Sequence, residues 1–198
     1  MIKAIVFDVG GVLLDNAWPA MLEHYTTHLN VEQGRFVEVY EDIVNEWQSG
    51  SIREEVFWER MCRRLERNMP KSESLWLDGF KKAYKEKDDV FKLIKSLKEK
   101  GYKIGLLSNT EVPIMHFLIE KQYQHFDVFI YSCGIGLIKP DREIYEETAK
   151  QLTVLPEETI FIDDKEENVE GAKKIGMIGV QFKDAKQLEN MLHTLLKQ

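Results

Sequence analysis

Five short apolar segments, each ending in polar or small residues, constrain the fold of this chain more than any other feature. The first, "AIVFD", runs into Asp8, and the others lie at 103–110, 127–132, 159–164 and 177–182. Continuous apolar runs of this length are typical of strands buried on both faces of a sheet. Helical patterns separate or follow them, at 88–100, 111–122, 141–152, 166–174 and 184–197. This alternation predicts an α/β fold: a Rossmann-like parallel sheet with helices on both faces.

Residues 16–86 break this rhythm, because they contain no convincing buried strand. The pattern predicts helices at 17–30, 32–48, 52–67 and 73–85, with "SIRE" (Ser51 to Glu54) as a capping box. All four tryptophans lie in this stretch, where they would fill a small helical core; alternatively Trp18 stands at a ligand entrance. We expect a core formed by 1–15 and 87–198, with 16–86 as an all-helical cap domain inserted after the first strand.

The composition is that of a globular chain that does not bind nucleic acid. The 198 residues carry a formal net charge of −7, whereas non-specific nucleic-acid binding needs a surface rich in Lys and Arg. No apolar run approaches the ~20 residues that span a membrane, and the start "MIKAIVFD" lacks a signal-peptide pattern. Cys62 and Cys133 have no CxxC spacing. We therefore expect a cytoplasmic protein with two reduced thiols and no membrane partner.

Polar side chains stand where the apolar segments end. In an open parallel sheet the carboxyl ends of the strands share one edge, and ligands bind beyond it. The polar residues at or just after these ends are Asp8, Ser108, Asn109, Lys139, Asp163 and Asp164. The sequence therefore predicts that three carboxylates, a hydroxyl and a lysine gather at one edge of the sheet.

Such a cluster suits a divalent cation and a phosphate. Carboxylates alone would repel one another, and oxygen ligands are those that Mg²⁺ prefers. Mg²⁺ and the lysine would neutralise a phosphate, which the serine and backbone N–H groups would hydrogen-bond. A carboxylate beside a metal-bound phosphate can act as a nucleophile and form an aspartyl-phosphate. Each element alone is an ordinary turn, loop or helix start, so the prediction depends on their order along successive strand ends.

At these positions the chain resembles the haloacid dehalogenase superfamily, whose commonest members are Mg²⁺-dependent phosphatases. "FDVGGVLLD", "LLSNT", "IKPD" and "FIDDKEENVEGAKKIGM" are similar to its four motifs, and the insert resembles its helical C1 cap. "WQSGSIREEVFW" is similar to the sugar-1-phosphate (glucose-1-phosphatase-like) subgroup. The resemblance implies a Mg²⁺-dependent phosphatase that hydrolyses a small phosphorylated metabolite, most plausibly a sugar phosphate, through an aspartyl-phosphate.

The resemblance also implies roles for individual residues. Asp8 is the nucleophile, and Ser108, Asn109 and Lys139 bind the phosphate, Ser108 and Lys139 with catalytic roles. The metal ligands are Asp8, the backbone carbonyl of Gly10, Asp164 directly and Asp163 through water, and Asn168 supports the loop that carries the two aspartates.

Gly10 departs from the usual phosphatase motif, in which an aspartate two residues after the nucleophile is the general acid and base. The glycine keeps the metal-binding carbonyl but removes a carboxyl group whose chemistry is typically worth about 10²–10⁴ in rate. A sugar 1-phosphate compensates, because its anomeric hydroxyl is a more acidic leaving group than an ordinary alcohol. Asp15 is a second candidate for the proton donor, or else a residue of the cap hinge. Gly10 itself has a further explanation, a backbone φ above zero.

Two other classes stay open at this point. The haloacid dehalogenases proper also lack that acid and need no metal, but they carry an aromatic residue at the Gly10 position and lack the paired Asp163 and Asp164. The lost carboxyl group also keeps open a catalytically weak ligand-binding or scaffolding relative as an alternative to the phosphatase. His24 and His28, four residues apart on one helix face, have the spacing of a zinc pair, but no third ligand is evident, so we expect a solvated face.

Overall fold

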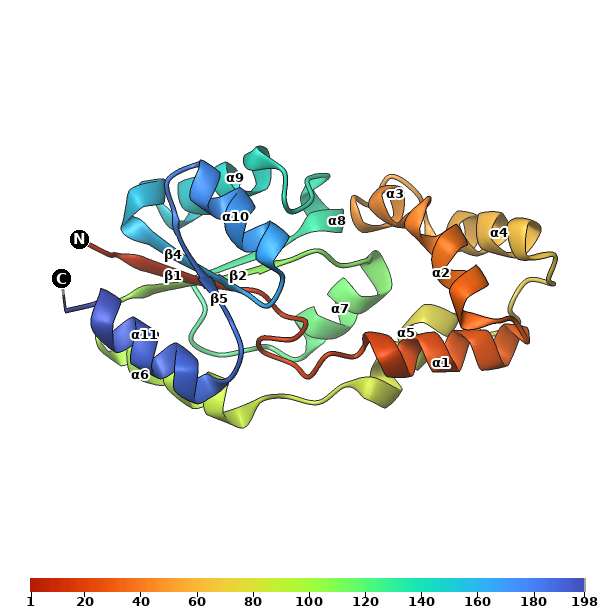
Figure 1. The fold of residues 1–198 in the computed structure, drawn as a ribbon, viewed down its shortest axis with the longest axis horizontal. Coiled ribbons are helices and arrows are strands. Elements are labelled where there is room, and N and C mark those ends of the chain that lie inside the picture. Colours follow the sequence, from red (N-terminus) through yellow and green to blue (C-terminus); the bar gives the residue numbers. More distant parts are fainter. Residues whose placement is uncertain (198) are drawn as a thin grey trace.

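The five apolar segments form the strands of one parallel sheet in a computed structural model that describes residues 1–197 (Figure 1). The strands are β1 (Ala4–Phe7), β2 (Lys103–Ser108), β3 (Val128–Tyr131), β4 (Thr159–Asp163) and β5 (Ile178–Gln181). Their order across the sheet is β3-β2-β1-β4-β5, and every neighbouring pair is parallel. The predicted Rossmann-like α/β fold is therefore confirmed, and β1 occupies the centre of the sheet.

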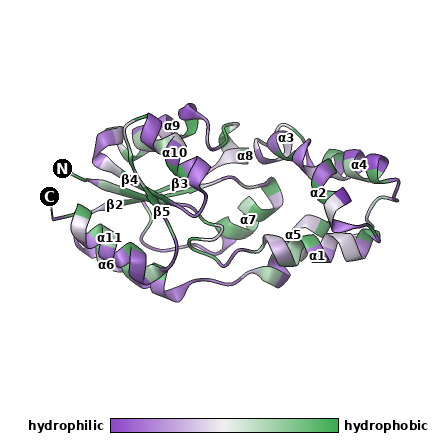
Figure 2. Ribbon diagram, in the orientation of Figure 1, coloured by the Kyte–Doolittle hydropathy of each residue, from purple (hydrophilic) through white to green (hydrophobic). Residues whose placement is uncertain are grey.

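Helices cover both faces of this sheet. Ala4 and Val6 of β1 belong to a buried cluster with α9 (Arg142–Leu152) and α10 (Glu166–Lys174). Ile5 and Phe7 point the other way, into a cluster with α6 (Asp88–Glu99) and α11 (Ala185–Leu195). Successive strand residues alternate between faces, so a strand covered on both sides must be apolar throughout. Figure 2 shows the result, with hydrophobic strands between helices of mixed character.

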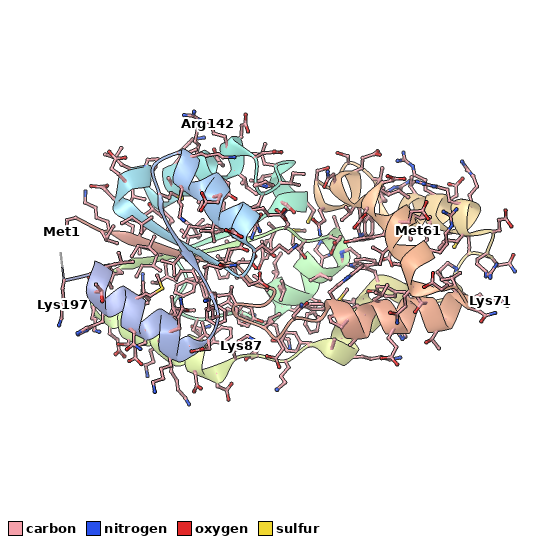
Figure 3. The ribbon with its side chains drawn as sticks, viewed as in Figure 1. Met1, Met61, Lys71, Lys87, Arg142 and Lys197 are labelled. Atoms are coloured by element: carbon pink, nitrogen blue, oxygen red, sulfur yellow. The ribbon has the colours of Figure 1, made fainter. Side chains whose placement is uncertain are left out.

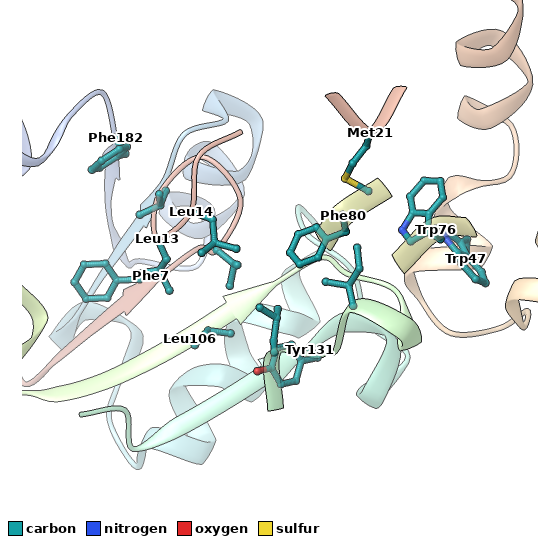
Figure 4. Packing of buried hydrophobic residues seen from close by; sticks show 14 of the residues in the cluster. Phe7, Leu13, Leu14, Met21, Trp47, Trp76, Phe80, Leu106, Tyr131 and Phe182 are labelled. Atoms are coloured by element: carbon teal, nitrogen blue, oxygen red, sulfur yellow. The ribbon is translucent and has the colours of Figure 1, made fainter. Parts of the chain in front are cut away.

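Residues 16–86 form five helices that gather at one end of the molecule, beyond the carboxyl ends of the strands (Figure 1). They are α1 (Trp18–Leu29), α2 (Gln33–Glu41), α3 (Val44–Gln48), α4 (Glu54–Leu65) and α5 (Leu75–Ala83). Trp47, Trp58 and Trp76 are buried between them, and Trp18 is half-buried against Tyr40. Phe7, Phe80, Trp76 and Trp47 belong to one buried apolar cluster that extends from the sheet into the insert, and Figure 4 shows part of it.

Two local predictions in this insert are wrong. The helix expected at 32–48 is two helices, because the chain turns at Asp42 and Ile43, where the Ile43 N–H bonds to Tyr40 O three residues back. The "SIRE" capping box does not form, because α4 begins at Glu54 with Arg53 as its N-cap, two residues later than a cap at Ser51 requires. The Glu54 carboxylate accepts hydrogen bonds from Trp58 Nε1 at 3.0 Å and Trp76 N at 3.2 Å instead.

Two short elements between the strands of the core lie outside the predicted helices. Helix α7 (Val112–Glu120) lies where 111–122 was predicted, whereas the short α8 (Ser132–Ile135) and the 3₁₀ turn η1 (Pro156–Glu158) were not anticipated. Cys62 and Cys133 are both free thiols. Within residues 1–197 we find no helix with the length and apolar character to cross a membrane.

The two chain segments that enter and leave the insert run side by side. Leu14 and Glu86 form an antiparallel bridge, Asp15 N donates to Lys85 O, and Lys87 N donates to Leu13 O, both at 2.9 Å. Figure 3 labels Lys87 at this crossing. We propose on this basis that 16–86 is a cap domain and that 1–15 with 87–198 is the core.

Candidate active site

Three adjacent strands bring the predicted site residues together. Phe7 of β1 pairs with Leu106 of β2 and with Ile162 of β4, so the residues that follow lie at one edge of the sheet. Asp8 extends this register, because its N–H donates to Ile162 O at 2.9 Å. Sequence alone predicts this juxtaposition, since the carboxyl ends of parallel strands share an edge.

Asp8, Asp163 and Asp164 form one acidic cluster, in which each offers a carboxylate oxygen and these oxygens lie within 4.8 Å of one another. Asp163 is fully buried, Asp8 is 7% exposed and Asp164 is half-buried. Burial raises the pKa of Asp8 to about 7 and also raises that of Asp164, and in each case the Asp163 carboxylate adds to the effect. The cluster is therefore charged at a cost that a bound cation would relieve.

Lys139 is the counter-ion inside this cluster. Its Nζ donates to Asp8 Oδ1 at 2.6 Å, to Asp163 Oδ2 at 2.7 Å and to Leu107 O at 3.2 Å. Burial alone would disfavour the ammonium, but the Asp8 and Asp163 carboxylates outweigh it and raise the pKa of Lys139. Three carboxylates and one ammonium leave a formal charge of −2, the charge that one divalent cation balances.

Ser108 and Asn109 meet the Lys139 loop in different ways. Asn109 Nδ2 donates to Lys139 O, and Lys139 N donates to Asn109 Oδ1, both at 2.8 Å. The Asn109 side chain is therefore committed to holding this loop. The buried Ser108 hydroxyl has only a long 3.5 Å contact, to Asn109 O, among the described residues, so its donor is available to a ligand.

The loop that carries the two aspartates is held by buried polar groups. Asn168 Nδ2 donates to Asp163 Oδ1 at 3.1 Å and to Oδ2 at 3.0 Å, and Lys165 N donates to Oδ1 at 2.9 Å. Tyr145 Oη fixes this part of the helix by donating to Asn168 O at 2.8 Å. The supporting position expected for Asn168 is therefore the one that it occupies.

The two glycines after Asp8 differ in what they permit. Gly10 does not have a positive φ, and a Cβ built there would meet nothing within 4 Å, so the backbone explanation for this glycine is wrong. Gly11 has φ +81°, and a Cβ there would lie 2.2 Å from Asp164 Oδ2. Gly11, which the sequence did not single out, is the glycine that lets Asp164 approach the β1 loop.

Asp15 and the histidine pair are accounted for by other contacts. Asp15 pairs with Lys87 at 2.9 Å and Lys85 at 3.0 Å, and hydrogen bonds from these two lysines lower its pKa. A carboxyl group held ionised in this way is a poor proton donor. Asp15 lies where the segments that enter and leave the insert run side by side, which is the position of a hinge residue. His24 Nδ1 lies 3.2 Å from Lys82 Nζ, and no group of three metal-ligating side chains within residues 1–197 includes His24 or His28.

The sequence also missed Glu111, a buried carboxylate directly after the Ser108–Thr110 loop. It accepts hydrogen bonds from Gln48 Nε2 at 3.1 Å and Trp76 Nε1 at 3.0 Å, two residues of the helical insert. The signal that could have found it is an acidic residue at the start of an otherwise apolar helix, a pattern that is more often a simple N-terminal charge.

Known proteins of similar length are similar in sequence to this chain. A sesquiterpene phosphatase from Aspergillus oryzae is 28% identical over 186 residues, covering 92% of this chain and 91% of that protein. A D-ribitol-5-phosphate phosphatase from Bacteroides thetaiotaomicron is 27% identical over 189 residues, covering 89% of each.

Solved structures show the shared fold. A protein from Porphyromonas gingivalis, described as a predicted HAD-like family hydrolase, superposes with a TM-score of 0.81 at 24% identity, covering 100% of this chain and 99% of that one. A HAD family enzyme from Bacteroides thetaiotaomicron, crystallised with magnesium and inorganic phosphate, has a TM-score of 0.76 at 22% identity and covers 95% and 99%. The sequence model of the haloacid dehalogenase-like hydrolases matches residues 2–176. With that match, and with all four motifs at one sheet edge, the chain belongs to the haloacid dehalogenase-like hydrolase family.

Proposed function

We propose that this protein is a Mg²⁺-dependent phosphatase that hydrolyses a small phosphomonoester through a phosphorylated Asp8. The observation that carries the proposal is the buried Lys139, whose ammonium bridges Asp8 and Asp163 inside a cluster of three carboxylates. That arrangement offers positive charge to a phosphate and oxygen ligands to a cation at the same edge. The relatives named as phosphatases support the same class.

The donor set of the site fits Mg²⁺. Carboxylate oxygens of Asp8, Asp163 and Asp164 lie within 4.8 Å of one another, and hard oxygen donors are those that Mg²⁺ prefers. We assign Asp8, the Gly10 carbonyl and Asp164 as direct ligands, with Asp163 acting through water. Asp163 suits the indirect role, because Lys139, Asn168 and the Lys165 N–H already occupy its oxygens. When bound, Mg²⁺ would neutralise the cluster and polarise the phosphate.

The side chains of the site bind the phosphate and take part in the two displacement steps. Lys139 and the Ser108 hydroxyl hold the phosphate oxygens. The Asn109 side chain is already bonded to the backbone of Lys139, so Asn109 would contact the phosphate through its own backbone N–H. A carboxylate oxygen of Asp8 attacks phosphorus, and the bond from phosphorus to the leaving oxygen breaks with its electron pair. Water then attacks the phosphorus of the acyl phosphate, which releases inorganic phosphate and returns the Asp8 carboxylate.

Leaving-group chemistry narrows the substrate. Gly10 supplies no acid, and the pKa of Asp15 is lowered, so the leaving oxygen departs without a carboxylic acid at either position. An acidic leaving group needs less help, and we therefore propose a sugar phosphate, with the anomeric 1-phosphate as the best case. The half-buried Trp18, whose ring lies tilted against that of Tyr40 at a centroid distance of 4.7 Å, is a candidate wall for the sugar.

The test is a panel of sugar phosphates, nucleotides, aryl phosphates and 2-haloacids, assayed with Mg²⁺ and with EDTA. Phosphate release that requires Mg²⁺ supports the proposal. Halide release in EDTA would instead identify a dehalogenase, and no turnover of any compound would leave a binding or scaffolding protein.

A further inference from the structure

Glu111 carries a buried carboxylate whose hydrogen-bond donors both come from the cap. Its side chain is 3% exposed, with Gln48 Nε2 bonded to Oε1 at 3.1 Å and Trp76 Nε1 bonded to Oε2 at 3.0 Å. Both donors are neutral, and the charged side chain that influences it, Glu54, is itself an acid. Tyr25, Tyr40 and Cys133 are the other titratable groups that feel its charge.

Burying the Glu111 carboxylate costs free energy, and the buried carboxylate needs hydrogen-bond donors in defined positions. Burial raises the pKa of Glu111, and the hydrogen bonds from Gln48 and Trp76 act in the opposite direction. Hydrogen bonds to a charged group are worth more than neutral ones, and losing a donor leaves the charge buried and unpaired. Separation of the two surfaces, by contrast, would return the carboxylate to water and offset part of the lost bonding. The hydrogen bonds of Glu111 therefore favour the contact between the insert and the core, while hydration of the carboxylate lowers the free-energy cost of separating the two surfaces.

Two further contacts define the same surface. Ser132 Oγ donates to Gln48 O at 2.6 Å and accepts from Thr110 N at 2.9 Å, so Gln48 is held through its backbone as well as its side chain. Gly50 has φ +72°, and a Cβ there would lie 2.4 Å from Cys133 O. The end of α3 therefore rests on the start of α8, and Ser132 joins it to Thr110 in the loop that follows Ser108.

We propose that Glu111 is a positioning residue that sets the closed position of α3 and α5 over the active site. This inference rests on the proposed function, because it concerns the site that the cap covers. Glu111 follows Ser108 by three residues, so the same short segment carries the phosphate-binding hydroxyl and the carboxylate that accepts hydrogen bonds from the cap. Cap position and phosphate site are tied through this segment.

The effect of this contact on the kinetics depends on the fraction of molecules in which the cap is closed. When only the closed form binds substrate fully, the apparent affinity falls in proportion to the closed fraction. Glu111→Gln keeps the size of the side chain but turns one acceptor into a donor, which faces the donor of Gln48 or Trp76. We expect KM for a sugar phosphate to rise about tenfold, which is equivalent to about 1.4 kcal/mol in binding. The value of kcat should change by less than about threefold.

An exchange of the two side chains provides the conservative rescue. Gln48→Glu alone places two carboxylates together and should also raise KM. The double variant, Gln48→Glu with Glu111→Gln, reverses the direction of that hydrogen bond and leaves an amide oxygen for Trp76 Nε1. It should return KM to within about threefold of the original value. Glu54→Gln is the matched control, because Glu54 also accepts from an indole N–H but lies wholly within the cap.

Hydrogen exchange on the ligand-free protein tests the contact without reference to turnover. Amides in 44–52 and 108–113 should exchange faster in each single variant, recover in the double variant and stay unchanged in Glu54→Gln. Unchanged exchange in both single variants, or equal acceleration in Glu54→Gln, would overturn the proposal. If Glu111→Gln does not fold, Gln48→Ala breaks the contact from the cap side. If exchange follows the expected pattern but no phosphomonoester is hydrolysed, the phosphatase assignment fails and the role of Glu111 stands.

Discussion

Gly11 and Asp164 approach so closely that a Cβ on Gly11 would lie 2.2 Å from Oδ2 of Asp164. The backbone of Gly11 has φ +81°, a conformation that residues with a side chain rarely adopt. The loop after β1 and the loop after β4 therefore meet without a side chain between them. This contact places one proposed metal ligand beside the loop that carries two others.

Gly11→Ala should weaken metal binding while Gly10→Ala leaves it nearly unchanged. The new methyl group at position 11 must displace Asp164, whereas at position 10 it meets nothing within 4 Å. Disturbing a ligand's support typically costs roughly 10–100-fold in metal affinity. Titration calorimetry with Mg²⁺ measures both variants, and equal affinities would show that Asp164 does not need its present position.

A Mg²⁺-soaked crystal should show one octahedral ion bound to Asp8, the Gly10 carbonyl and Asp164. The bond lengths expected for Mg²⁺ and oxygen are about 2.1 Å. Asp163 should remain paired with Lys139 and Asn168 and contact the ion through water. Electron density without an ion at millimolar Mg²⁺ would count against the metal assignment.

Asp8→Asn should abolish turnover and leave the fold intact, because a carboxamide is a poor nucleophile and the cluster loses one of its mutually repelling charges. Circular dichroism of the variant is the control for folding. Substantial remaining activity would show that Asp8 is not the nucleophile.

The same variant should change how stability depends on pH in EDTA. The pKa of Asp8 rises from 3.8 to about 7 on folding, so the folded state holds a proton that the unfolded chain loses. This contribution makes the metal-free protein less stable as pH rises from about 4 to about 7, and it is constant above that range. Thermal melts of Asp8→Asn should lack this decline, and curves parallel to those of the original protein would contradict the shift.

Gly10→Asp should make turnover less sensitive to the leaving group. Without an acid the leaving oxygen departs as an alkoxide, and each ~1.4 kcal/mol of added barrier costs tenfold in rate. Space for the side chain exists, because Gly10 has open surroundings and no positive φ. A plot of log kcat against leaving-group pKa should be steep for the glycine protein and shallower for Gly10→Asp. Two shallow, equal slopes would mean that another residue already donates the proton.

The features that sequence predicts here are those governed by local pattern. Strands buried on both faces must be apolar, and residues at their carboxyl ends must share an edge, so β1 and Asp8 follow from the order of segments. The hydrogen bonds of Glu111 do not follow, because its partners Gln48 and Trp76 lie 63 and 35 residues away in the chain. The role of the Asn109 side chain is hidden for the same reason, since Lys139 is 30 residues distant.

Local rules also fail where tertiary contacts compete for a side chain. Glu54 has the spacing of a capping box, but two indole-bearing residues claim its carboxylate. Gly10 and Gly11 are indistinguishable as letters, and only the approach of Asp164, more than 150 positions later, separates their roles.

The bridge between Leu14 and Glu86 holds the entry and the exit of the helical insert side by side. Because the entry and the exit are neighbours, the length and fold of the stretch from 16 to 85 place no demand on the pairing of β1 with β4. An insert of another size that starts and ends at this bridge and covers the same apolar surface would leave Asp8 in its place in the sheet. On the proposed function, substrate preference can therefore change through one contiguous stretch of the chain while the residues at the sheet edge stay the same.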